Sequence, residues 1–195
     1  MKSESNEFII KIAETCRANL GTAYKVGGCV RDELLGIEPK DIDLEVFGIL
    51  PNKLQSLIES IGTISLCGQS FGILKVTDPE SKITVDVGIP RKEQSIGSSH
   101  KDFIINSDCN MSVEDASDRR DFTINALYQN VLSNEILDFH GGVSDLHAGI
   151  IRRVNESRFM EDPLRILRAI QFAARFQFVI EQNTFNLLKN NIESV

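Results

Sequence analysis

Apolar and polar positions along this chain follow two different periods, and the dominant period changes near residue 154. Residues 7–19 place Phe8, Ile9 and Ile12 on one face of a predicted helix, which Gly21 ends. Shorter runs of strand character then predict strands at residues 24–26, 43–47, 71–76, 83–89 and 136–139. Beyond residue 154 the strand signals stop and helical spacing returns.

Helical spacing predicts further helical segments at residues 30–35, 51–61, 162–176 and from near 184 to the end. In the segment 162–176, Asp162 is the expected N-cap and Pro163 the first helical position. The same helix is expected to bury one apolar stripe and to carry its arginines on another face: Leu164, Leu167, Ile170 and Ala174 against Arg165, Arg168 and Arg175.

Residues 90–118 show no regular period and are rich in Ser, Asp and Lys. This pattern is typical of a mobile loop or of a functional lid, and periodicity leaves both open. Taken together, the elements predict an α/β protein with a mixed sheet in front and helices behind. We expect one domain at residues 1–153 and the start of an all-helical domain at residues 154–195.

Composition and charge narrow the class of protein. The chain has 195 residues, of which 42% are hydrophobic and 25% charged, so it is globular rather than disordered. Its net charge of -7 argues against a polybasic protein that binds nucleic acid non-specifically. It contains no apolar run of about 18 residues that would span a membrane. The run from Phe8 to Ile10 is too short for a signal peptide.

The cysteines and histidines do not predict a metal site. The cysteines are scattered without a C-x-x-C pair, which is typical of reduced, buried thiols in a cytoplasmic protein: Cys16, Cys29, Cys67 and Cys109. The histidines have no zinc-ligand spacing: His100, His140 and His147.

Two carboxylates, Asp41 and Asp43, are two positions apart at the start of a predicted strand. On a strand they would point to the same face, where they repel each other unless a cation lies between them. Their hard oxygen atoms suit Mg²⁺, with Mn²⁺ as the other option. Taken alone, the pair is better explained as a solvated strand edge.

The surrounding sequence favours the metal interpretation. Upstream, Gly27 and Gly28 lie between a predicted strand and a helix start, where free amides favour phosphate, and Arg31 adds a positive charge. Downstream, Asp86 is a further carboxylate within a predicted strand. The glycines belong neither to a Walker A loop nor to a dinucleotide-binding fingerprint, because the defining residues of both are missing. Together these features describe a two-metal site for nucleotidyl transfer.

At this point the chain resembles the class II tRNA nucleotidyltransferases, which include CCA-adding enzymes and bacterial poly(A) polymerases. The resemblance rests on motifs that occur in the order of that family: GGCVRDELLG and KDIDLEVFG, then RRDFTINAL, then RFMEDPLRILRAIQFAARF. It covers roughly residues 24–180. It implies a head with the polymerase-β-like nucleotidyltransferase fold, followed by the first helices of an all-helical neck.

The resemblance also implies roles for individual residues. Asp41 and Asp43 match the metal-binding, catalytic aspartates, and Asp86 matches a third carboxylate that either serves as base or orients the other two. The positions that match nucleotide contacts are Gly28 and Arg31 for phosphates, Arg120, Asp121 and Asn125 for the sugar, and Asp162 and Arg165 for the base. Arg168 matches a neighbour of either the phosphates or the base. The chain departs from many members of the family in having Gln171 where they carry a further arginine.

The implied reaction is the addition of C and A from CTP and ATP to the 3′ end of tRNA. A poly(A) polymerase and an enzyme that adds only CC or only A remain alternatives, because the head motifs hardly separate them. A non-catalytic nucleotide- or RNA-binding module gains nothing from three clustered acids. A small-molecule nucleotidyltransferase has no reason to carry R-R-D-F-T-I-N or E-D-P-L-R. The chain ends within the expected neck, so we expect it to bind tRNA weakly.

Overall fold

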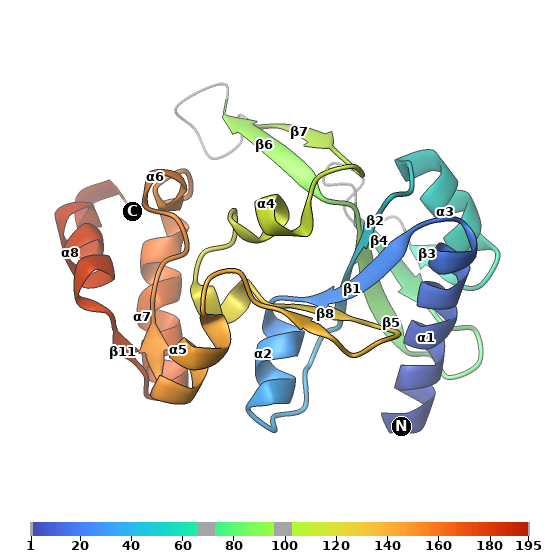
Figure 1. Ribbon diagram of the computed structural model, residues 1–195, viewed down its shortest axis with the longest axis horizontal. Coiled ribbons are helices and arrows are strands. Elements are labelled where there is room, and N and C mark those ends of the chain that lie inside the picture. Colours follow the sequence, from blue (N-terminus) through green and yellow to red (C-terminus); the bar gives the residue numbers. More distant parts are fainter. Residues whose placement is uncertain (1, 66–72, 96–102, 195) are drawn as a thin grey trace.

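A seven-stranded mixed sheet forms the centre of the computed structural model, which describes residues 2–65, 73–95 and 103–194 (Figure 1). The strand order is β3-β4-β5-β2-β1-β8-β9, and within this sheet only β2 and β5 run parallel. The strands are β1 (Thr22–Val26), β2 (Asp43–Phe47), β3 (Thr63–Ser65), β4 (Ile73–Thr77), β5 (Thr84–Gly88), β8 (Tyr128–Asn130) and β9 (Ile136–Leu137).

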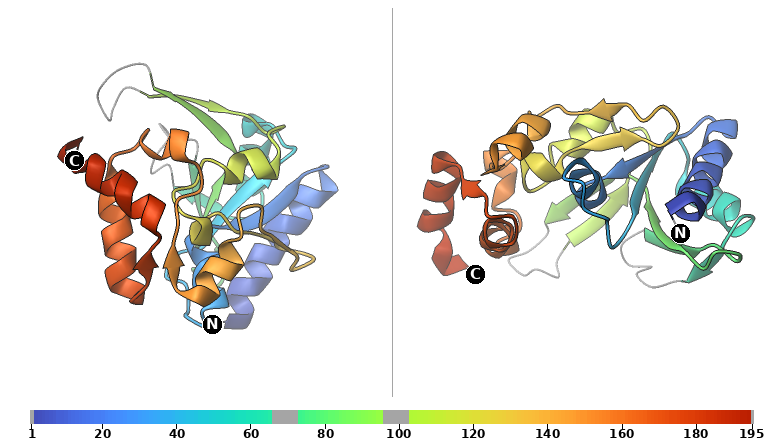
Figure 2. Two further views of the ribbon diagram at one scale, coloured as in Figure 1. Left: turned by 60° about the vertical axis from the view of Figure 1, so that its left-hand side comes forward. Right: turned by 90° about the horizontal axis from the view of Figure 1, so that it is seen from below.

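Two helices, α1 (Lys2–Ala18) and α3 (Pro51–Glu59), cover one face of this sheet (Figure 2). Strand alternation turns Ala23, Leu44 and Val46 toward them, where they pack with Ile9 and Ile12. All five side chains are at most 3% exposed, so each contributes to stability by apolar burial. This layer of helices holds the strands in place from one face of the sheet.

The opposite face of the sheet carries an aromatic cluster. Tyr24, Phe47 and Tyr128 pack edge to face, with ring centroids 5.5 to 6.2 Å apart. The short helix α2 (Gly28–Leu34) comes after β1 in the chain, and the short helix α4 (Val113–Ser117) comes after β7. Strand β6 (Arg91–Ser95) pairs with β7 (Phe103–Ser107) in a hairpin separate from the main sheet. This face therefore remains partly open at one end of the strands.

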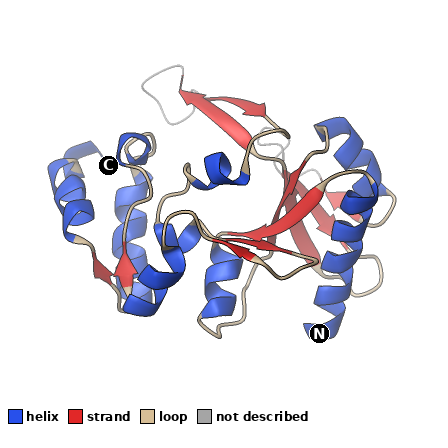
Figure 3. Cartoon of the chain, in the orientation of Figure 1, coloured by secondary structure: helices blue, strands red, loops and turns tan. Residues whose placement is uncertain are grey.

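A second core lies at the other end of the molecule, where helices dominate (Figures 1 and 3). Phe122 packs against Phe159 and Phe172, with ring centroids 5.6 and 5.8 Å away. The elements of this part are the 3-10 helix η2 (Thr123–Asn125), α5 (Gly142–Ala148), β10 (Ile150–Ile151), α6 (Glu156–Phe159), α7 (Leu164–Phe176), β11 (Val179–Ile180), α8 (Gln182–Asn190) and the 3-10 helix η3 (Ile192–Ser194).

The predicted division near residue 154 crosses this second core. β10 pairs with β11 from the far side of that position, and Phe122 contacts residues of α7. The helical part is therefore packed directly onto the end of the front part. A domain boundary at residues 153 and 154 stays a prediction.

The predicted helices and strands largely match the structure, but residues 90–118 are not irregular where they are described. They form β6, β7 and α4, while residues 96–102 lie outside the described part. The sequence of β6, RKEQS, has no apolar position that would alternate, and its strand is defined by backbone pairing with β7. The sequence also did not predict β3 or α5, which are short.

The buried face of α7 was predicted wrongly. Leu164, Leu167 and Ile170 are 50%, 49% and 52% exposed, whereas Ile166 and Phe172 are at most 7% exposed. Both sets have helical spacing, so periodicity alone allowed either face to be the core. The cluster around Phe122 and Phe159 selects the face with Ile166, Ala169 and Phe172.

Three of the cysteines are free and buried, as predicted: Cys16, Cys29 and Cys109. Burial raises the pKa of the Cys16 thiol to about 11 and also raises that of Cys29. Cys67 lies outside the described residues. No helix in the described part of the chain is both long enough and apolar enough to cross a membrane.

Candidate active site

A cavity of about 570 Å³ opens on the aromatic face of the sheet, between the strand ends and α7. Almost all predicted site residues line it, although they come from distant parts of the chain: Gly28, Arg31, Asp43, Asp86, Arg120, Asp121, Asn125, Asp162, Arg165 and Arg168. Asp41 is the one predicted site residue that does not line it.

Two carboxylates meet at this cavity because β2 and β5 run parallel and in register. Asp43 lies directly opposite Asp86, so both side chains point to the same face. The Asp86 amide donates to the Ile42 carbonyl over 2.9 Å, and Lys75 Nζ lies 3.6 Å from Asp86 Oδ1. Lys75 is a positive charge at this site that the sequence argument missed.

The position of Asp41 differs from the prediction that it shares a strand with Asp43. β2 begins at Asp43, and Asp41 lies in an exposed bend before it. A shared strand face therefore does not orient the two aspartates, and the connection from α2 sets the position of Asp41. The charge of Asp41 still acts on the Asp43 carboxyl.

The pKa of the Asp43 carboxyl is raised above its ordinary value. Desolvation by the walls of the cavity is the main cause, and the nearby Arg120 opposes it. The negative charges of Asp86 and Asp41 raise the pKa further, and Lys75 lowers it. The site thus gathers like charges whose repulsion a cation would offset.

The donor set fits a hard divalent cation in its chemistry, because carboxylate oxygens are the ligands that such ions prefer. Among the described residues, no group of three His, Cys, Asp or Glu side chains is already arranged as a metal cluster. The fit therefore rests on the raised pKa of Asp43 and on its register with Asp86.

The chain passes from β1 into α2 through a glycine that other residues would strain. Gly27 has φ +67°, and a Cβ atom there would lie 3.3 Å from Arg120 Nη1. Gly28 begins α2, and a Cβ atom on it would lie 3.4 Å from Arg31 Nη2. Bare backbone therefore borders the cavity beside two guanidinium groups.

Arg31 is buried, with only 4% of its surface exposed. Its Nε donates to Asp32 Oδ1 over 2.8 Å, and its Nη1 donates to Asn125 Oδ1 over 2.5 Å. The guanidinium carbon also lies 5.1 Å from the ring centroid of Phe172 and 4.8 Å from that of Phe176. Arg31 therefore joins α2 to α7 besides lining the cavity.

Arg120 faces the strands through a short polar network. Its Nη2 lies 3.4 Å from both Glu45 Oε2 and the Tyr128 hydroxyl, which itself donates to Glu45 over 2.5 Å. Burial disfavours the charged form of Arg120, but Tyr128 and Glu45 outweigh it and raise the pKa of the guanidinium. Burial also raises the pKa of the Tyr128 phenol. Arg120 thus remains a fixed positive charge.

Glu45 and Tyr128 were not predicted as site residues, although the strand pattern contained a signal for Glu45. Glu45 is two positions after Asp43, so the strand period of two puts it on the same face. Tyr128 reaches the network only because β8 pairs with β1. Nothing in the local sequence indicates that contact.

The Asp121 carboxylate is held by three donors. Its Oδ1 accepts from the Phe122 amide over 2.8 Å and from Asn125 Nδ2 over 3.0 Å. Its Oδ2 accepts from Arg168 Nε over 2.7 Å. A carboxylate has about four acceptor positions, so one remains for a ligand hydroxyl.

Helix α7 brings the last predicted residues to the cavity. Asp162 Oδ1 accepts from the Leu164 amide over 3.0 Å, but the N-cap of α7 is Pro163 and the helix begins at Leu164, so the predicted N-cap is wrong by one residue. Arg165 donates to the carbonyls of Arg158 and Arg119 over 2.9 and 3.0 Å. Its guanidinium is thereby fixed beside the cavity before any ligand binds.

The fold and this cavity define a class of protein: a mixed-sheet head whose carboxylates and guanidinium groups converge at the ends of parallel strands. The family model for the poly(A) polymerase head domain matches residues 23–152. The chain belongs to this family of nucleotidyltransferases, which generally use a divalent metal ion.

Curated relatives of the chain carry two names. It is 36% identical over 171 residues to the multifunctional CCA protein of Nitrosomonas eutropha, covering 88% of this chain and 39% of that protein. It is 33% identical over 167 residues to poly(A) polymerase I of Haemophilus influenzae, covering 82% of this chain and 36% of that protein. The chain thus spans about two fifths of the length of these relatives.

Solved structures of CCA-adding enzymes share the fold of this chain. A CCA-adding enzyme without ligand matches 98% of this chain and 45% of its own, with a TM-score of 0.83 and 30% identity. A complex of a CCA-adding enzyme with ATP matches 100% of this chain and 43% of its own, with a TM-score of 0.77 and 30% identity. The Bacillus stearothermophilus CCA-adding enzyme in complex with CTP matches 91% of this chain and 41% of its own, with a TM-score of 0.73 and 27% identity.

Proposed function

We propose that this chain is the catalytic head and the beginning of the neck of a tRNA nucleotidyltransferase that adds C and A from CTP and ATP. The observation that carries the proposal is the parallel register of Asp43 with Asp86 at a cavity that Arg120 and the α7 residues also line. The relatives named as CCA proteins support the choice of tRNA as the acceptor.

In the proposed reaction, the 3′-hydroxyl oxygen of the RNA attacks the α-phosphorus of the nucleotide. A new phosphodiester bond forms, the bond to the β-phosphate breaks, and pyrophosphate leaves. The hydroxyl proton passes to a carboxylate, for which Asp86 is the candidate because its position beside Asp43 is set by backbone pairing. Asp86 alternatively orients the other two carboxylates.

Asp41 and Asp43 are the proposed ligands of Mg²⁺, with Mn²⁺ as the other ion of suitable chemistry. When bound, such an ion lowers the pKa of the attacking hydroxyl and stabilises the charge of the departing pyrophosphate. The raised pKa of Asp43 supports this assignment, because a nearby cation removes the repulsion that its neighbours impose.

The triphosphate and the sugar are assigned to the middle of the cavity. Gly28 leaves backbone amides uncovered for the phosphates, and Arg31 and Arg120 provide positive charge there. Asp121 and Asn125 are assigned to the ribose hydroxyls. Their side chains are already hydrogen-bonded to each other, so the ribose meets a fixed surface.

Base selection is assigned to Asp162 and Arg165, with Arg168 as their neighbour. Cytosine and adenine both present an amine donor beside a ring-nitrogen acceptor, which a carboxylate and a guanidinium complement. Guanine and uracil present the reverse order and are rejected. The protein thus selects two bases without a nucleic-acid template. The fixed position of Arg165 supports this role.

A poly(A) polymerase is the second candidate, and the relative from Haemophilus influenzae favours it specifically. An enzyme that adds only CC or only A uses the same cavity. Sequencing of the 3′ ends of RNA products separates the three. We place the activity in the cytoplasm, where tRNA is processed in bacteria such as those of the named relatives.

The test is incorporation of radiolabelled CTP or ATP into tRNA that lacks its 3′ end, with UTP and GTP as controls. The proposal expects Mg²⁺-dependent incorporation of C and A that disappears in Asp43→Asn. A chain that binds CTP and ATP at this cavity, but transfers neither under any metal condition, would instead be a non-catalytic binding module.

A further inference from the structure

A buried tyrosine lies behind the candidate active site without lining it. Tyr128 of β8 has no exposed surface, whereas Glu45 and Arg120 both line the cavity. The Tyr128 hydroxyl donates to Glu45 Oε2 over 2.5 Å and accepts from Arg120 Nη2 over 3.4 Å. A ligand in the cavity therefore senses Tyr128 only through the other two side chains.

The guanidinium group of Arg120 is held from two sides. Its Nη2 atom donates to Glu45 Oε2 over 3.4 Å, and its carbon lies 5.5 Å from the ring centroid of Tyr128. On the other side, a Cβ atom on Gly27 would lie 3.3 Å from Nη1. The Nη2 end thus faces the sheet and the Nη1 end faces the glycine turn. Since the Arg120 side chain is still 30% exposed, it also reaches the cavity.

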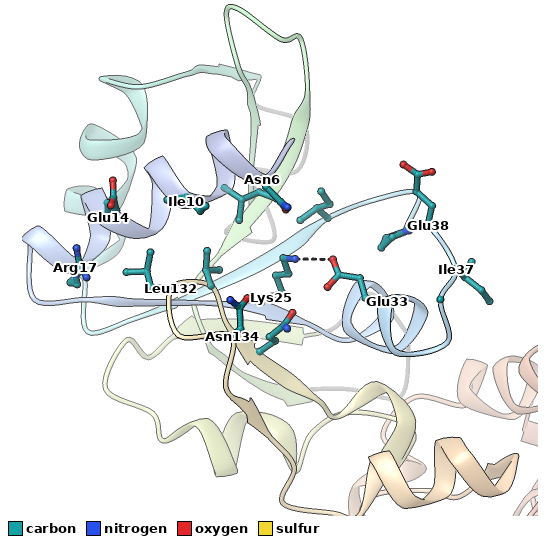
Figure 4. A pocket seen from close by; sticks show the side chains of 16 residues that line it. Asn6, Ile10, Glu14, Arg17, Lys25, Glu33, Ile37, Glu38, Leu132 and Asn134 are labelled. Atoms are coloured by element: carbon teal, nitrogen blue, oxygen red, sulfur yellow. Dashed lines mark hydrogen bonds and ion pairs between the residues drawn. The ribbon is translucent and has the colours of Figure 1, made fainter. Parts of the chain in front are cut away.

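Arg120 is the cation that pairs with Glu45, because the nearby lysines pair elsewhere. Lys25 of β1 lines a different cavity, of about 770 Å³ beside α1, where it is ion-paired with Glu33 (Figure 4). Lys75 of β4 is ion-paired with the carboxylate of β5. Glu45 and Arg120 therefore form one unit, to which the Tyr128 hydroxyl adds a hydrogen bond.

The position of Glu45 is unexpected if the cavity takes a triphosphate. A carboxylate that lines such a cavity repels phosphate, so its charge alone opposes binding. The same carboxylate holds a guanidinium in one orientation, which favours binding because the arginine need not be ordered when the ligand arrives. The two effects have opposite signs, so a measurement distinguishes them.

We propose that Glu45 and Tyr128 are positioning residues, which hold Arg120 so that its Nη1 end binds a phosphate of the nucleotide beside the glycine turn. The proposal rests on the proposed function for the class of ligand. It assigns no contact with the ligand to Tyr128, and it gives Glu45 a role that outweighs the repulsion of its charge.

The test is isothermal titration calorimetry of the whole chain with tripolyphosphate in buffer that contains Mg²⁺, at constant ionic strength. Tyr128→Phe removes only the hydroxyl and should weaken binding about fivefold, because Arg120 must then be ordered by the ligand. The matched control is Tyr24→Phe, which removes a hydroxyl from the same aromatic cluster but not from this network. It should bind as wild type does, and thermal melting checks that both variants fold.

Two further variants test the route through Arg120. Glu45→Gln should also weaken binding, because a neutral amide holds a guanidinium less strongly than a carboxylate does. In an Arg120→Ala background, Tyr128→Phe should cause no further loss. Tighter binding by Glu45→Gln, wild-type binding by Tyr128→Phe, or an undiminished loss in the Arg120→Ala background would each overturn the proposal. Absence of tripolyphosphate binding by the wild-type chain would overturn it as well.

The binding measurement needs no catalysis, so the two proposals fail separately. If tripolyphosphate binding follows the expected pattern but no nucleotide is transferred, the proposed function is wrong and the positioning role stands. If nucleotides are transferred but Tyr128→Phe binds tripolyphosphate as wild type does, the positioning role is wrong and the proposed function stands.

Discussion

The Nε atom of Arg168 lies 2.7 Å from Oδ2 of Asp121, and this ion pair ties α7 to the segment that leads into η2. The two partners differ in burial: the Arg168 side chain is 48% exposed and that of Asp121 only 7%. Asp121 also accepts from Asn125, which in turn accepts from Arg31 of α2. One buried carboxylate thus connects three segments that are distant in the sequence.

The first prediction concerns this connection. Asp121→Ala should lower the free energy of unfolding by about 2 kcal/mol or more, because the buried Asn125 amide and Phe122 amide lose their acceptor. Arg168→Ala should cost less, about 1 kcal/mol, since Asp121 keeps two donors. Urea denaturation of both variants and of the double variant measures the coupling, and additive effects would contradict it.

The second prediction concerns catalysis. Asp43→Asn should reduce nucleotidyl transfer by roughly 10³-fold or more, because a lost metal ligand raises the barrier by several kcal/mol. We expect Asp41→Asn to act in the same direction. Both variants should keep the fold, which circular dichroism and thermal melting check. Turnover at the wild-type level in either variant would rule out its role as a metal ligand.

The third prediction concerns pH. A carboxyl group with a raised pKa binds its proton more tightly in the folded state than in the unfolded state, where the pKa of Asp is about 3.9. The contribution of Asp43 to stability is therefore most favourable below about pH 3.9 and is lost as the pH rises through the raised folded pKa. In metal-free buffer, the melting temperature of Asp43→Asn should thus rise relative to wild type between about pH 4 and 7.

Asp78 provides a control because its pKa is shifted in the opposite direction from that of Asp43. Hydrogen bonds from Ser81 lower the pKa of its carboxyl, so its contribution is present above about pH 3.9 and is lost as the pH falls through the lowered folded value. Asp78→Asn should therefore be relatively less stable at neutral pH than at low pH. The same trend in both variants would show that the difference does not come from these carboxyl groups.

The fourth prediction concerns base selection. Asp162→Ala and Arg165→Ala should relax or abolish the preference for CTP and ATP when all four nucleoside triphosphates are assayed. Asp162 also accepts from the Leu164 amide, so its loss should lower stability by about 1 kcal/mol. The Asp162→Ala variant would contradict the base-reading role if it lost only this stability and still rejected UTP and GTP.

The fifth prediction concerns RNA. The net charge of -7 repels the phosphate backbone, so the chain should bind CTP or ATP more readily than it binds tRNA at about 0.15 M salt. Filter binding with labelled tRNA at two salt concentrations measures this. Tight binding that resists salt would show that this chain alone carries the RNA-gripping surface.

Much of the site was predictable from local sequence, because its residues occur within short motifs. Strand alternation correctly predicted a strand at residues 43–47, and its period also contained the signal for Glu45. The start of α7 was predicted to within one residue because Asp before Pro is a local feature, although the N-cap is Pro163 rather than Asp162. The motifs could not indicate Lys75 or Tyr128, because their contacts depend on the strand order.

The sequence by itself determined the family, the order of the main helices and strands, and the residue types that converge on the cavity. Only the tertiary structure decided which face of α7 is buried. Two apolar stripes have helical spacing there, and contact with Phe122 and Phe159 selects Ile166 and Phe172. It also decided that Arg31 and Asp121 bridge the front and the helical back, because a buried charge needs partners that only packing brings within reach.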